Sequence, residues 1–328
     1  MNTTWKELLL AAFLGLVLPW ILVNTVLSME RSPTAASEPT QILETEGQTV
    51  PHSAMTMTLR QEEGSTEMDM DTYLTGVLLA ELPASFEMEA KKAQAVAART
   101  FAWKAAVTGG KHGDGSVCGN ASCCQAYISP EAYMARGGSE EAVEQARLAA
   151  SGTSGYVLTY KGELIEATYF SCSGGSTEDA VAVWGADFPY LRAVESPGEE
   201  NATHFTDTVY FTEEELNQAL GVTLSGTPDT WFGYATYTAG GGVNTLRIGG
   251  KDYKGTELRT LLGLRSTAFT VTPDANGVTV TTRGFGHRVG MSQYGAEAMA
   301  VSGKDYRQIL AYYYAGTELE FREGEDAS

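Results

Sequence analysis

The stretch DTYLTGVLLAELPASFEMEAKKAQAVAARTFAWKAAV, residues 71–107, decides the expected fold. Its first part, 71–82, is an apolar run with Asp71 placed to cap the N-terminus of a helix. Pro83 ends or bends that helix, because proline cannot continue the hydrogen-bond ladder. The second part, 87–107, is rich in alanine and other strong helix formers. The sequence therefore predicts two successive helices joined at a proline.

Strands are expected on both sides of this helical pair. Residues 53–60 alternate in polarity and predict a first strand, and 155–160 with 163–170 predict a hairpin. Further helices are expected at 139–150, 212–220, 255–263, 293–302 and 305–314. Helices early and late in the chain indicate an α+β fold, with helical segments at both ends packed against a β-rich middle, about 185–283. A substrate groove is expected between two lobes.

Length and charge narrow the class of protein. The chain has 328 residues, enough for one large or two modest domains, and a formal net charge of −19. We expect no nucleic-acid partner, since binding phosphates requires an excess of Lys and Arg. A mostly neutral polymer such as a glycan remains compatible with the acidic chain.

The N-terminal region predicts a membrane anchor. Residues 8–27 form an apolar run, and twenty helical residues rise about 30 Å, the thickness of a bilayer core. No small-residue cleavage site follows, so we expect residues 1–27 to stay as a cytoplasmic stub plus a single transmembrane helix, and the alternatives are a signal peptide and a buried helix. The polar segment 28–52 is expected to be a flexible linker. The rest of the chain, with its main domain at 53–322, then lies on one side of the membrane, and its expected placement outside the cytoplasm rests on function more than on the flanking charges.

Glu81 is a candidate acid/base, and the alternative is an ordinary solvated surface residue. It lies at the end of the apolar run GVLLAEL, where apolar neighbours and the helix C-terminus both favour the protonated carboxyl. A raised pKa is what a general acid needs near neutral pH. No second carboxylate partner is evident, although most glycosidases use two. A single carboxyl suffices only if the substrate supplies its own nucleophile.

The loop after the second helix carries one histidine and three cysteines. His112, Cys118 and Cys124 are evenly spaced, and imidazole with thiolate suits zinc. Three ligands would leave a fourth position for water or a neighbouring group. A disulfide from Cys118 to Cys123 or Cys124, a pairing of Cys172 with a loop cysteine, and small buried thiols are the alternatives.

A glycine-rich element, GFGHRVGMSQYGAEAMA, occupies residues 284–300. Ser292 is placed to cap the helix that follows. His287, Ser292, Gln293 and Tyr294 offer the hydrogen-bond donors and the ring that sugar binding uses. The alternative is a structural turn with a buried histidine.

Four ordered segments carry a family resemblance. They are LLAELPASFEMEAKKAQAVAARTFA (78–102), CQAYIS (124–129), YFSCSGGSTE (169–178) and GFGHRVGMSQYGA (284–296). Together they resemble the stage II sporulation protein D family over about residues 55–320. The chain is also similar to amidase-enhancer proteins, which share the domain.

The resemblance implies a peptidoglycan lytic transglycosylase that acts in septal wall remodelling and engulfment during sporulation. Such an enzyme cleaves the β-1,4 bond between N-acetylmuramic acid and N-acetylglucosamine. Glu81 falls on the family's catalytic glutamate, and the C6 hydroxyl of the muramic acid is the nucleophile, which gives a 1,6-anhydro end. The resemblance also implies a zinc ion held by His112, Cys118 and Cys124. Cys123 is then an extra thiol without an assigned role.

The resemblance further implies partners. Stage II sporulation protein P, an amidase, strips the glycan that is the substrate, and stage II sporulation protein M is the membrane partner. From the residues themselves, additional candidates for the substrate groove are Gln94, Arg99, Tyr127, Tyr169 and Ser171, and the alternative for Arg99 is a surface or structural role. Two other hypotheses are a non-catalytic amidase enhancer that binds glycan and, ranked last, a zinc hydrolase.

Overall fold

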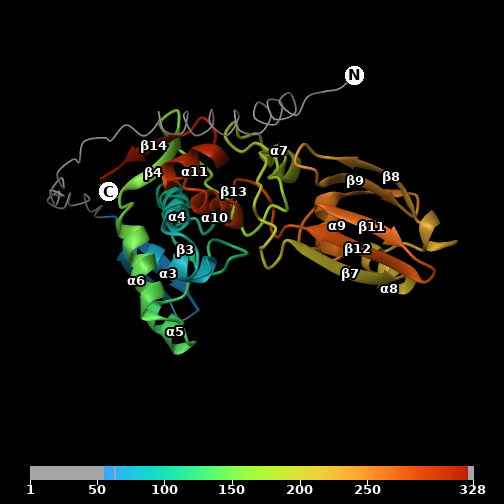
Figure 1. Ribbon diagram of the computed structural model, residues 1–328, viewed down its shortest axis with the longest axis horizontal. Coiled ribbons are helices and arrows are strands. Elements are labelled where there is room, and N and C mark those ends of the chain that lie inside the picture. The colour runs from blue at the N-terminus through green and yellow to red at the C-terminus, as the bar shows by residue number, and fades with distance from the viewer. Residues whose placement is uncertain (1–54, 63, 324–328) are drawn as a thin grey trace, which may run out of the picture. The chain divides into compact units, whose positions relative to one another are not determined.

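The computed structural model describes residues 55–62 and 64–323 (Figure 1). The expected anchor, 1–27, and the expected linker, 28–52, lie outside these residues. In the part of the chain that is described, no helix has both the length and the apolar character required to cross a bilayer.

Helices alternate with small sheets along the described chain, which confirms the expected α+β class. The helices are α3 (Met70–Glu81), α4 (Met88–Thr108), α5 (Pro130–Ala135), α6 (Glu140–Ser151), α7 (Ala180–Trp184), α8 (Glu213–Leu220), α9 (Gly255–Leu261), α10 (Gln293–Val301) and α11 (Tyr306–Tyr313), with the 3-10 turn η2 (Pro228–Thr230). The strands are β1 (Thr56–Gln61), β2 (Gly64–Asp69), β3 (Val117–Cys118), β4 (Tyr156–Tyr160), β5 (Glu163–Leu164), β6 (Tyr169–Phe170), β7 (Thr206–Thr212), β8 (Phe232–Tyr237), β9 (Val243–Ile248), β10 (Lys251–Lys254), β11 (Phe269–Pro273), β12 (Gly277–Arg283), β13 (Met291–Ser292) and β14 (Glu318–Phe321).

The predicted helical pair is present as α3 and α4, but the N-cap of α3 differs from the prediction. Asp69, not Asp71, accepts a hydrogen bond from the backbone N–H of Thr72. Asp71 instead forms an ion pair with Arg99 at 3.0 Å, which takes its carboxylate away from the helix terminus. Pro83 follows the extended C-cap residue of α3, as its missing N–H requires.

Helix α4 is the centre of the helical part. Helices α3, α6, α10 and α11 and strand β4 all pack against it (Figure 1). Its alanines belong to two core clusters, because small side chains let neighbours approach on several faces of one helix. One cluster contains Ala95, Ala98 and Ala102, and the other contains Ala90, Ala93 and Ala97.

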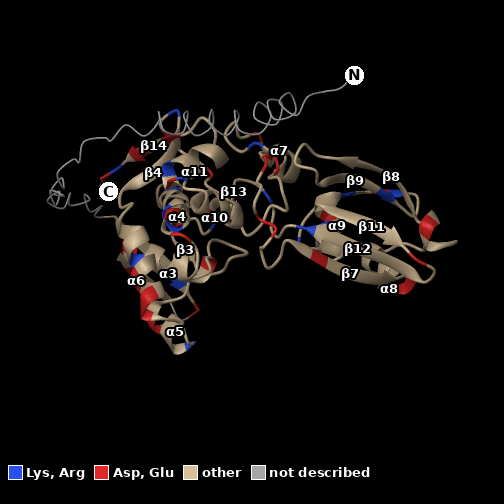
Figure 2. Ribbon diagram, in the orientation of Figure 1, with Lys and Arg blue, Asp and Glu red and all other residues tan. Residues whose placement is uncertain are grey.

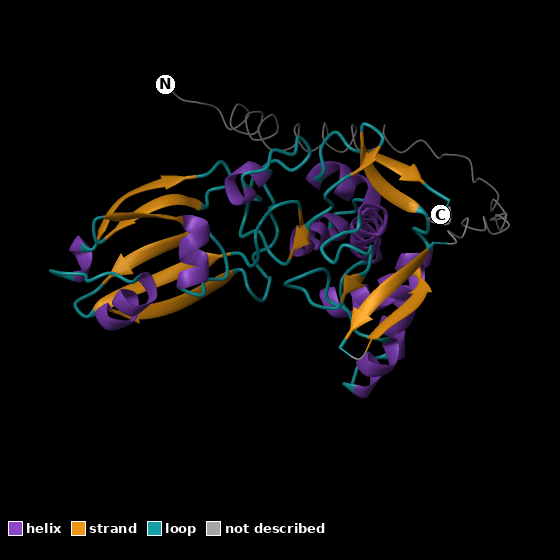
Figure 3. Cartoon of the chain, turned by 180° about the vertical axis from the view of Figure 1, so that it is seen from behind, coloured by secondary structure: helices purple, strands orange, loops and turns teal. Residues whose placement is uncertain are grey.

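The β-rich middle has two antiparallel sheets of three strands, in the orders β11-β12-β7 and β10-β9-β8. Strands dominate this part of the described chain, whereas helices dominate the rest (Figure 3). It has a hydrophobic core of its own, which includes Trp231, Ile248, Leu258 and Val280.

The hairpin expected at 155–170 is only partly present. Strands β4 and β5 pair around Lys161 and Gly162, whose φ angles of 54° and 81° suit a tight hairpin turn. Tyr169 and Phe170 leave this hairpin and pair in parallel with β13 instead. This long-range pairing places the segment after β5 beside the glycine-rich element that the sequence singled out.

A buried ion pair fixes the same junction. Arg288 donates to the carboxylate of Glu178 at 2.9 Å, and both side chains are almost fully buried. Arg288 also donates to the carbonyl oxygens of Ser173, Ser176 and Gly240 at 2.7–2.8 Å. Arg288 lies just before β13. Its guanidinium therefore ties the loop that follows β6 to Gly240 in the β-rich middle.

Candidate active site

A cavity of about 820 Å³ opens beside the C-terminal end of α3. Its volume lies within the range of about 300–1,000 Å³ that is usual for ligand sites. Segments from the helical part, the cysteine loop, the β6–β13 junction and α9 all contribute to its wall. The side chains that line it include Glu81, Phe101, Lys111, Cys124, Gln125, Glu166, Tyr169, Ser171, Trp184, Phe188, Arg259, Phe285, His287 and Gln293.

Both carboxylate oxygens of Glu81 are held. Oε1 accepts from the backbone N–H of Ala126 at 2.8 Å, and Oε2 accepts from Nε2 of Gln293 at 3.1 Å. Burial raises the pKa of Glu81, and this effect outweighs the two hydrogen bonds, which lower it. The result is an oriented carboxyl whose protonated form is favoured, as a general acid requires.

A chain of hydrogen bonds supports the wall next to Glu81. The hydroxyl of Tyr73 donates to Oε1 of Gln125 at 2.8 Å, and Nε2 of Gln125 donates to the hydroxyl of Tyr169 at 2.9 Å. Burial, reinforced by the nearby charge of Glu81, raises the pKa of Tyr169 well above its ordinary value. Tyr169 is thus a neutral phenol that can donate a hydrogen bond at the cavity wall.

His287 is a wall residue in its neutral form. Burial lowers the pKa of His287 to about 4, and the positive charge of Arg259 acts in the same direction. Its Nδ1 accepts from the backbone N–H of Val289 at 3.1 Å. The ring packs against Phe170 and Trp184, with centroids 5.6 and 5.3 Å away. The ring is therefore uncharged at neutral pH.

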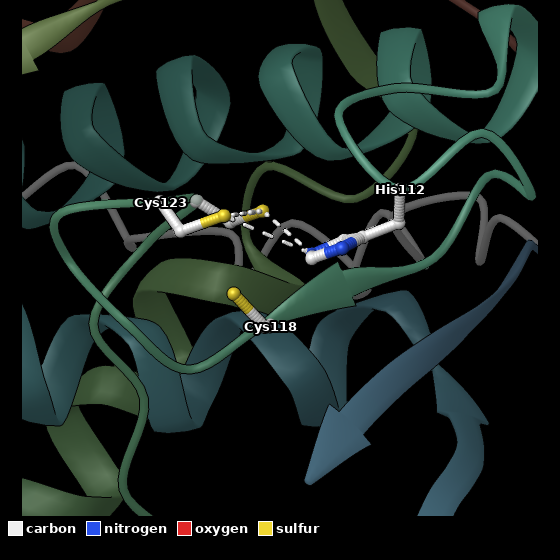
Figure 4. Close-up of side chains that lie close together, drawn as sticks. His112, Cys118 and Cys123 are labelled. Carbon is white, nitrogen blue, oxygen red and sulfur yellow. Dashed lines mark hydrogen bonds between the residues drawn. The ribbon is translucent and has the colours of Figure 1, made fainter.

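The cysteine loop gathers four metal-ligand atoms close to the cavity (Figure 4). The ligand atoms of His112, Cys118, Cys123 and Cys124 lie within 4.8 Å of one another. Nε2 of His112 is 3.5 Å from Sγ of Cys124 and 3.9 Å from Sγ of Cys123, and these two sulfurs are 3.9 Å apart. A tetrahedral zinc ion separates two sulfurs by about 3.8 Å and a sulfur from a nitrogen by about 3.5 Å. The three distances among His112, Cys123 and Cys124 are therefore those of a tetrahedral site, and Sγ of Cys118 lies within 4.8 Å of these ligand atoms.

None of the expected disulfides is present among the described residues. A disulfide requires about 2.05 Å between sulfurs, whereas all four cysteines of the described chain are free thiols. Burial would raise the pKa of Cys118, but hydrogen bonds with Asn120 and His112 outweigh it and lower the pKa to about 7. Cys172 lies elsewhere, where its thiol donates to Glu199 at 3.1 Å.

Comparison with known proteins places this geometry in a family. The family described as SpoIID, "Stage II sporulation protein", matches residues 60–160. Stage II sporulation protein D of Bacillus subtilis (strain 168) is 41% identical over 255 residues, which are 76% of this chain and 74% of that protein. The chain belongs to the stage II sporulation protein D family. This confirms the resemblance carried by the four sequence segments.

Two further relatives show how far the sequence similarity extends. Stage II sporulation protein D of Bacillus amyloliquefaciens is 40% identical over 254 residues, 76% of this chain and 74% of that protein. A protein named amidase enhancer, from Bacillus subtilis (strain 168), is 30% identical over 305 residues, 75% of this chain and 40% of that protein.

In this member of the stage II sporulation protein D family, only some of the expected site residues line the cavity. The residues that line the cavity are Glu81, Cys124, Tyr169, Ser171, His287 and Gln293. Two others, Gln94 and Arg99, are buried inside the helical part with 1% and 0% exposure. The guanidinium of Arg99 donates to Asp71 and to the carbonyl of Ala150 at 3.0 and 2.8 Å, so it ties helices together rather than contacting a substrate.

Three more expected residues do not line the cavity but contact or cap neighbouring elements. The ring of Tyr127 stacks on Tyr73 with centroids 5.9 Å apart. Ser292 is the N-cap of α10, as predicted. Tyr294 packs edge-on against Phe86. Each of them positions an element that carries a cavity residue.

The prediction from sequence did not identify several of the residues that line the cavity. Gln125 lies inside the CQAYIS segment but was given no role. Trp184 and Arg259 come from the middle of the chain, where no motif marked them. Cys123 has no role in the sequence prediction, because the family resemblance implies a set of one His and two Cys that His112, Cys118 and Cys124 fill.

Proposed function

We propose that this chain is a peptidoglycan lytic transglycosylase with Glu81 as its acid/base. The observation that carries the proposal is one buried carboxyl with a raised pKa, held by Ala126 and Gln293 in the cavity wall. The other carboxylate of the described wall, Glu166, forms an ion pair with Lys104 at 2.7 Å. A single available carboxyl favours a reaction in which the substrate provides the nucleophile.

In the proposed reaction, Glu81 gives its proton to the glycosidic oxygen between muramic acid and glucosamine. The bond from C1 of the muramic acid to that oxygen breaks. The carboxylate of Glu81 then takes the proton of the C6 hydroxyl, whose oxygen forms the new bond to C1. Proton and bonds balance without water, and the product carries a 1,6-anhydro ring.

The walls of the cavity suit a sugar strand. Trp184, Phe188 and Phe285 offer apolar faces on which sugar rings can stack. The neutral phenol of Tyr169 and the hydroxyl of Ser171 offer hydrogen bonds to sugar oxygens. This combination of aromatic faces and a few polar groups is typical of ligand sites.

We also propose that zinc is held by His112, Cys118, Cys123 and Cys124. With Cys123 as fourth ligand the coordination is complete, which is the arrangement of structural zinc sites. The ion would supply a crosslink that holds the cysteine loop, and through it Cys124 and Gln125, against the cavity. The proposed reaction needs no open coordination position.

The setting follows from the same proposal. We propose that residues 1–27 anchor the chain in the membrane and that the remainder acts on wall glycan outside the cytoplasm. Stage II sporulation protein P would supply glycan without stem peptides, and stage II sporulation protein M would be the membrane partner during engulfment.

Activity on stripped glycan tests the catalytic role. The full chain should release soluble sugar fragments, and Glu81→Gln should lower the rate by at least about 10²-fold, the usual worth of a general acid. Glu166→Gln, which alters the other wall carboxylate, should keep most of the activity. Equal losses in both variants would contradict the assignment of Glu81.

A non-catalytic amidase enhancer is the second candidate, favoured by the relative with that name. It predicts strand binding without release of fragments. It also predicts that the chain stimulates a wall amidase and that Glu81→Gln leaves this stimulation intact.

A further inference from the structure

Two positive charges of the cavity wall have no acidic partner. Arg259 on α9 and Lys111 on the cysteine loop both line the cavity that contains Glu81. Neither takes part in an ion pair within the described residues. Arg265, close to Arg259 in sequence, does have such a partner, Asp207, at 3.0 Å.

The hydrogen bonds of these two cations leave donors free for a ligand. The recorded bond of Arg259 runs from Nε to the carbonyl of Arg265 at 3.2 Å, so the two terminal nitrogens of its guanidinium remain available. Lys111 donates through Nζ to the carbonyl of Cys123, which carries no formal charge. Arg259 is more than half buried, which makes an unpaired charge costly unless an anion joins it.

The carboxylates of the cavity wall do not neutralise Arg259 and Lys111. Burial favours the neutral form of Glu81, and Glu166 is already paired with Lys104. Acidic side chains are frequent elsewhere, as along α6 and α8 (Figure 2). In a chain with a net charge of −19, this cavity therefore holds two cations that no carboxylate pairs with, which is unexpected for a site that binds only neutral sugars.

His287 shows that the two cations act on the same part of the wall. After burial, the charges of Arg259 and Lys111 both lower the pKa of His287. The two cations thus approach one ring from different elements. Because Arg259, Lys111 and His287 all line one cavity, an anionic group bound in it meets positive charge from two separate elements.

We propose that Arg259 and Lys111 form a carboxylate-binding subsite that recognises the lactyl group of the muramic acid. This inference rests on the proposed glycan substrate and adds residues that determine its specificity. The lactyl group is attached to C3 of the same ring whose C1 reacts. It is a charged carboxylate only when no stem peptide is attached, because the peptide converts it into a neutral amide. The subsite therefore favours stripped strands and places C1 near Glu81.

Three forms of the same strand test the subsite with the full chain. They are stripped glycan, stripped glycan with its lactyl carboxylates capped as methylamides, and glycan that keeps its stem peptides. Wild type should show a kcat/KM for stripped strands about 10- to 100-fold above that for capped strands, the range of a charge-assisted hydrogen bond. Arg259→Gln should reduce this ratio to within about threefold of one.

Arg247→Gln is the matched control, because Arg247 lies on β9 and pairs with Asp252 at 2.9 Å away from the cavity. It should keep the wild-type ratio. A wild-type ratio near one, or a ratio that survives Arg259→Gln, would overturn the subsite. Peptide-bearing strands cleaved as fast as stripped strands would show that the recognised carboxylate belongs to the peptide, which also overturns the lactyl assignment.

Equilibrium binding of the same strands separates this inference from the proposed function. If no strand is cleaved, the proposed function fails, and the ratio of dissociation constants for stripped and capped strands still decides the subsite. If strands are cleaved without any preference for the free carboxylate, the subsite fails and the proposed function stands.

Discussion

The buried pair of Arg288 and Glu178 is predicted to hold the cavity together, and Arg288→Met is the perturbation that tests it. This substitution keeps an unbranched side chain and the positive φ of 65° at the position. It removes the ion pair at 2.9 Å and three hydrogen bonds to carbonyl oxygens of separate segments. Glu178 is then left as a buried charge without its cation.

The expected loss is large because both side chains are almost fully buried. Removal of one partner of a buried ion pair costs about 3–5 kcal/mol. At roughly 2 °C per kcal/mol for a chain of this size, Tm should fall by roughly 6–10 °C. The exposed pair of Arg247 and Asp252 provides the comparison, and Arg247→Met should move Tm by no more than about 2 °C.

Thermal unfolding followed by circular dichroism measures both variants under one set of conditions. The double variant Arg288→Met with Glu178→Gln should recover part of the loss, because no uncompensated charge is then buried. Equal shifts of Tm for Arg288→Met and Arg247→Met would refute this account of the junction.

Three further predictions concern the site. The pKa of Glu81 is raised in the folded chain, so the stability that this group contributes is present at low pH and is lost as pH rises through that pKa. The Tm of Glu81→Gln relative to wild type should therefore increase between about pH 4 and about pH 8. A constant difference in Tm would contradict the burial argument. Gln293→Leu removes a hydrogen bond that lowers this pKa, so the high-pH limb of the kcat/KM profile should move to higher pH, whereas a move to lower pH would contradict the role of Gln293. Cys123→Ser should weaken zinc retention in a chelator competition assay at least about tenfold, while Cys172→Ser should not, and retention equal to wild type would remove Cys123 from the ligand set.

Local signals in the sequence were enough to predict the helical part. The alanine-rich run 87–107 and the proline at 83 predicted α4 and the end of α3, because both effects act within a few residues. The cap at Ser292 and the turn at Lys161 and Gly162 were predictable for the same reason. The N-cap of α3 was predicted at the wrong residue, because the carboxylate of Asp71 pairs with Arg99, 28 positions away in the sequence.

The site was predicted only where chemistry and local pattern coincide. Glu81 stood out because its own apolar run buries it. Trp184 and Arg259 reach the cavity through the folding of the middle of the chain, which no local pattern encodes. Sγ of Cys123 lies near the other three ligand atoms because the loop folds back on itself, and spacing along the sequence does not reveal this proximity.

Cleavage of stripped glycan in oxygen-18-labelled water, followed by mass spectrometry of the released sugars, tests the central claim most directly. If Glu81 drives attack by the C6 hydroxyl, the products carry 1,6-anhydro ends with no label from the solvent, and Glu81→Gln forms none of them. Reducing ends that contain oxygen-18 would show that water is the nucleophile and would contradict the account.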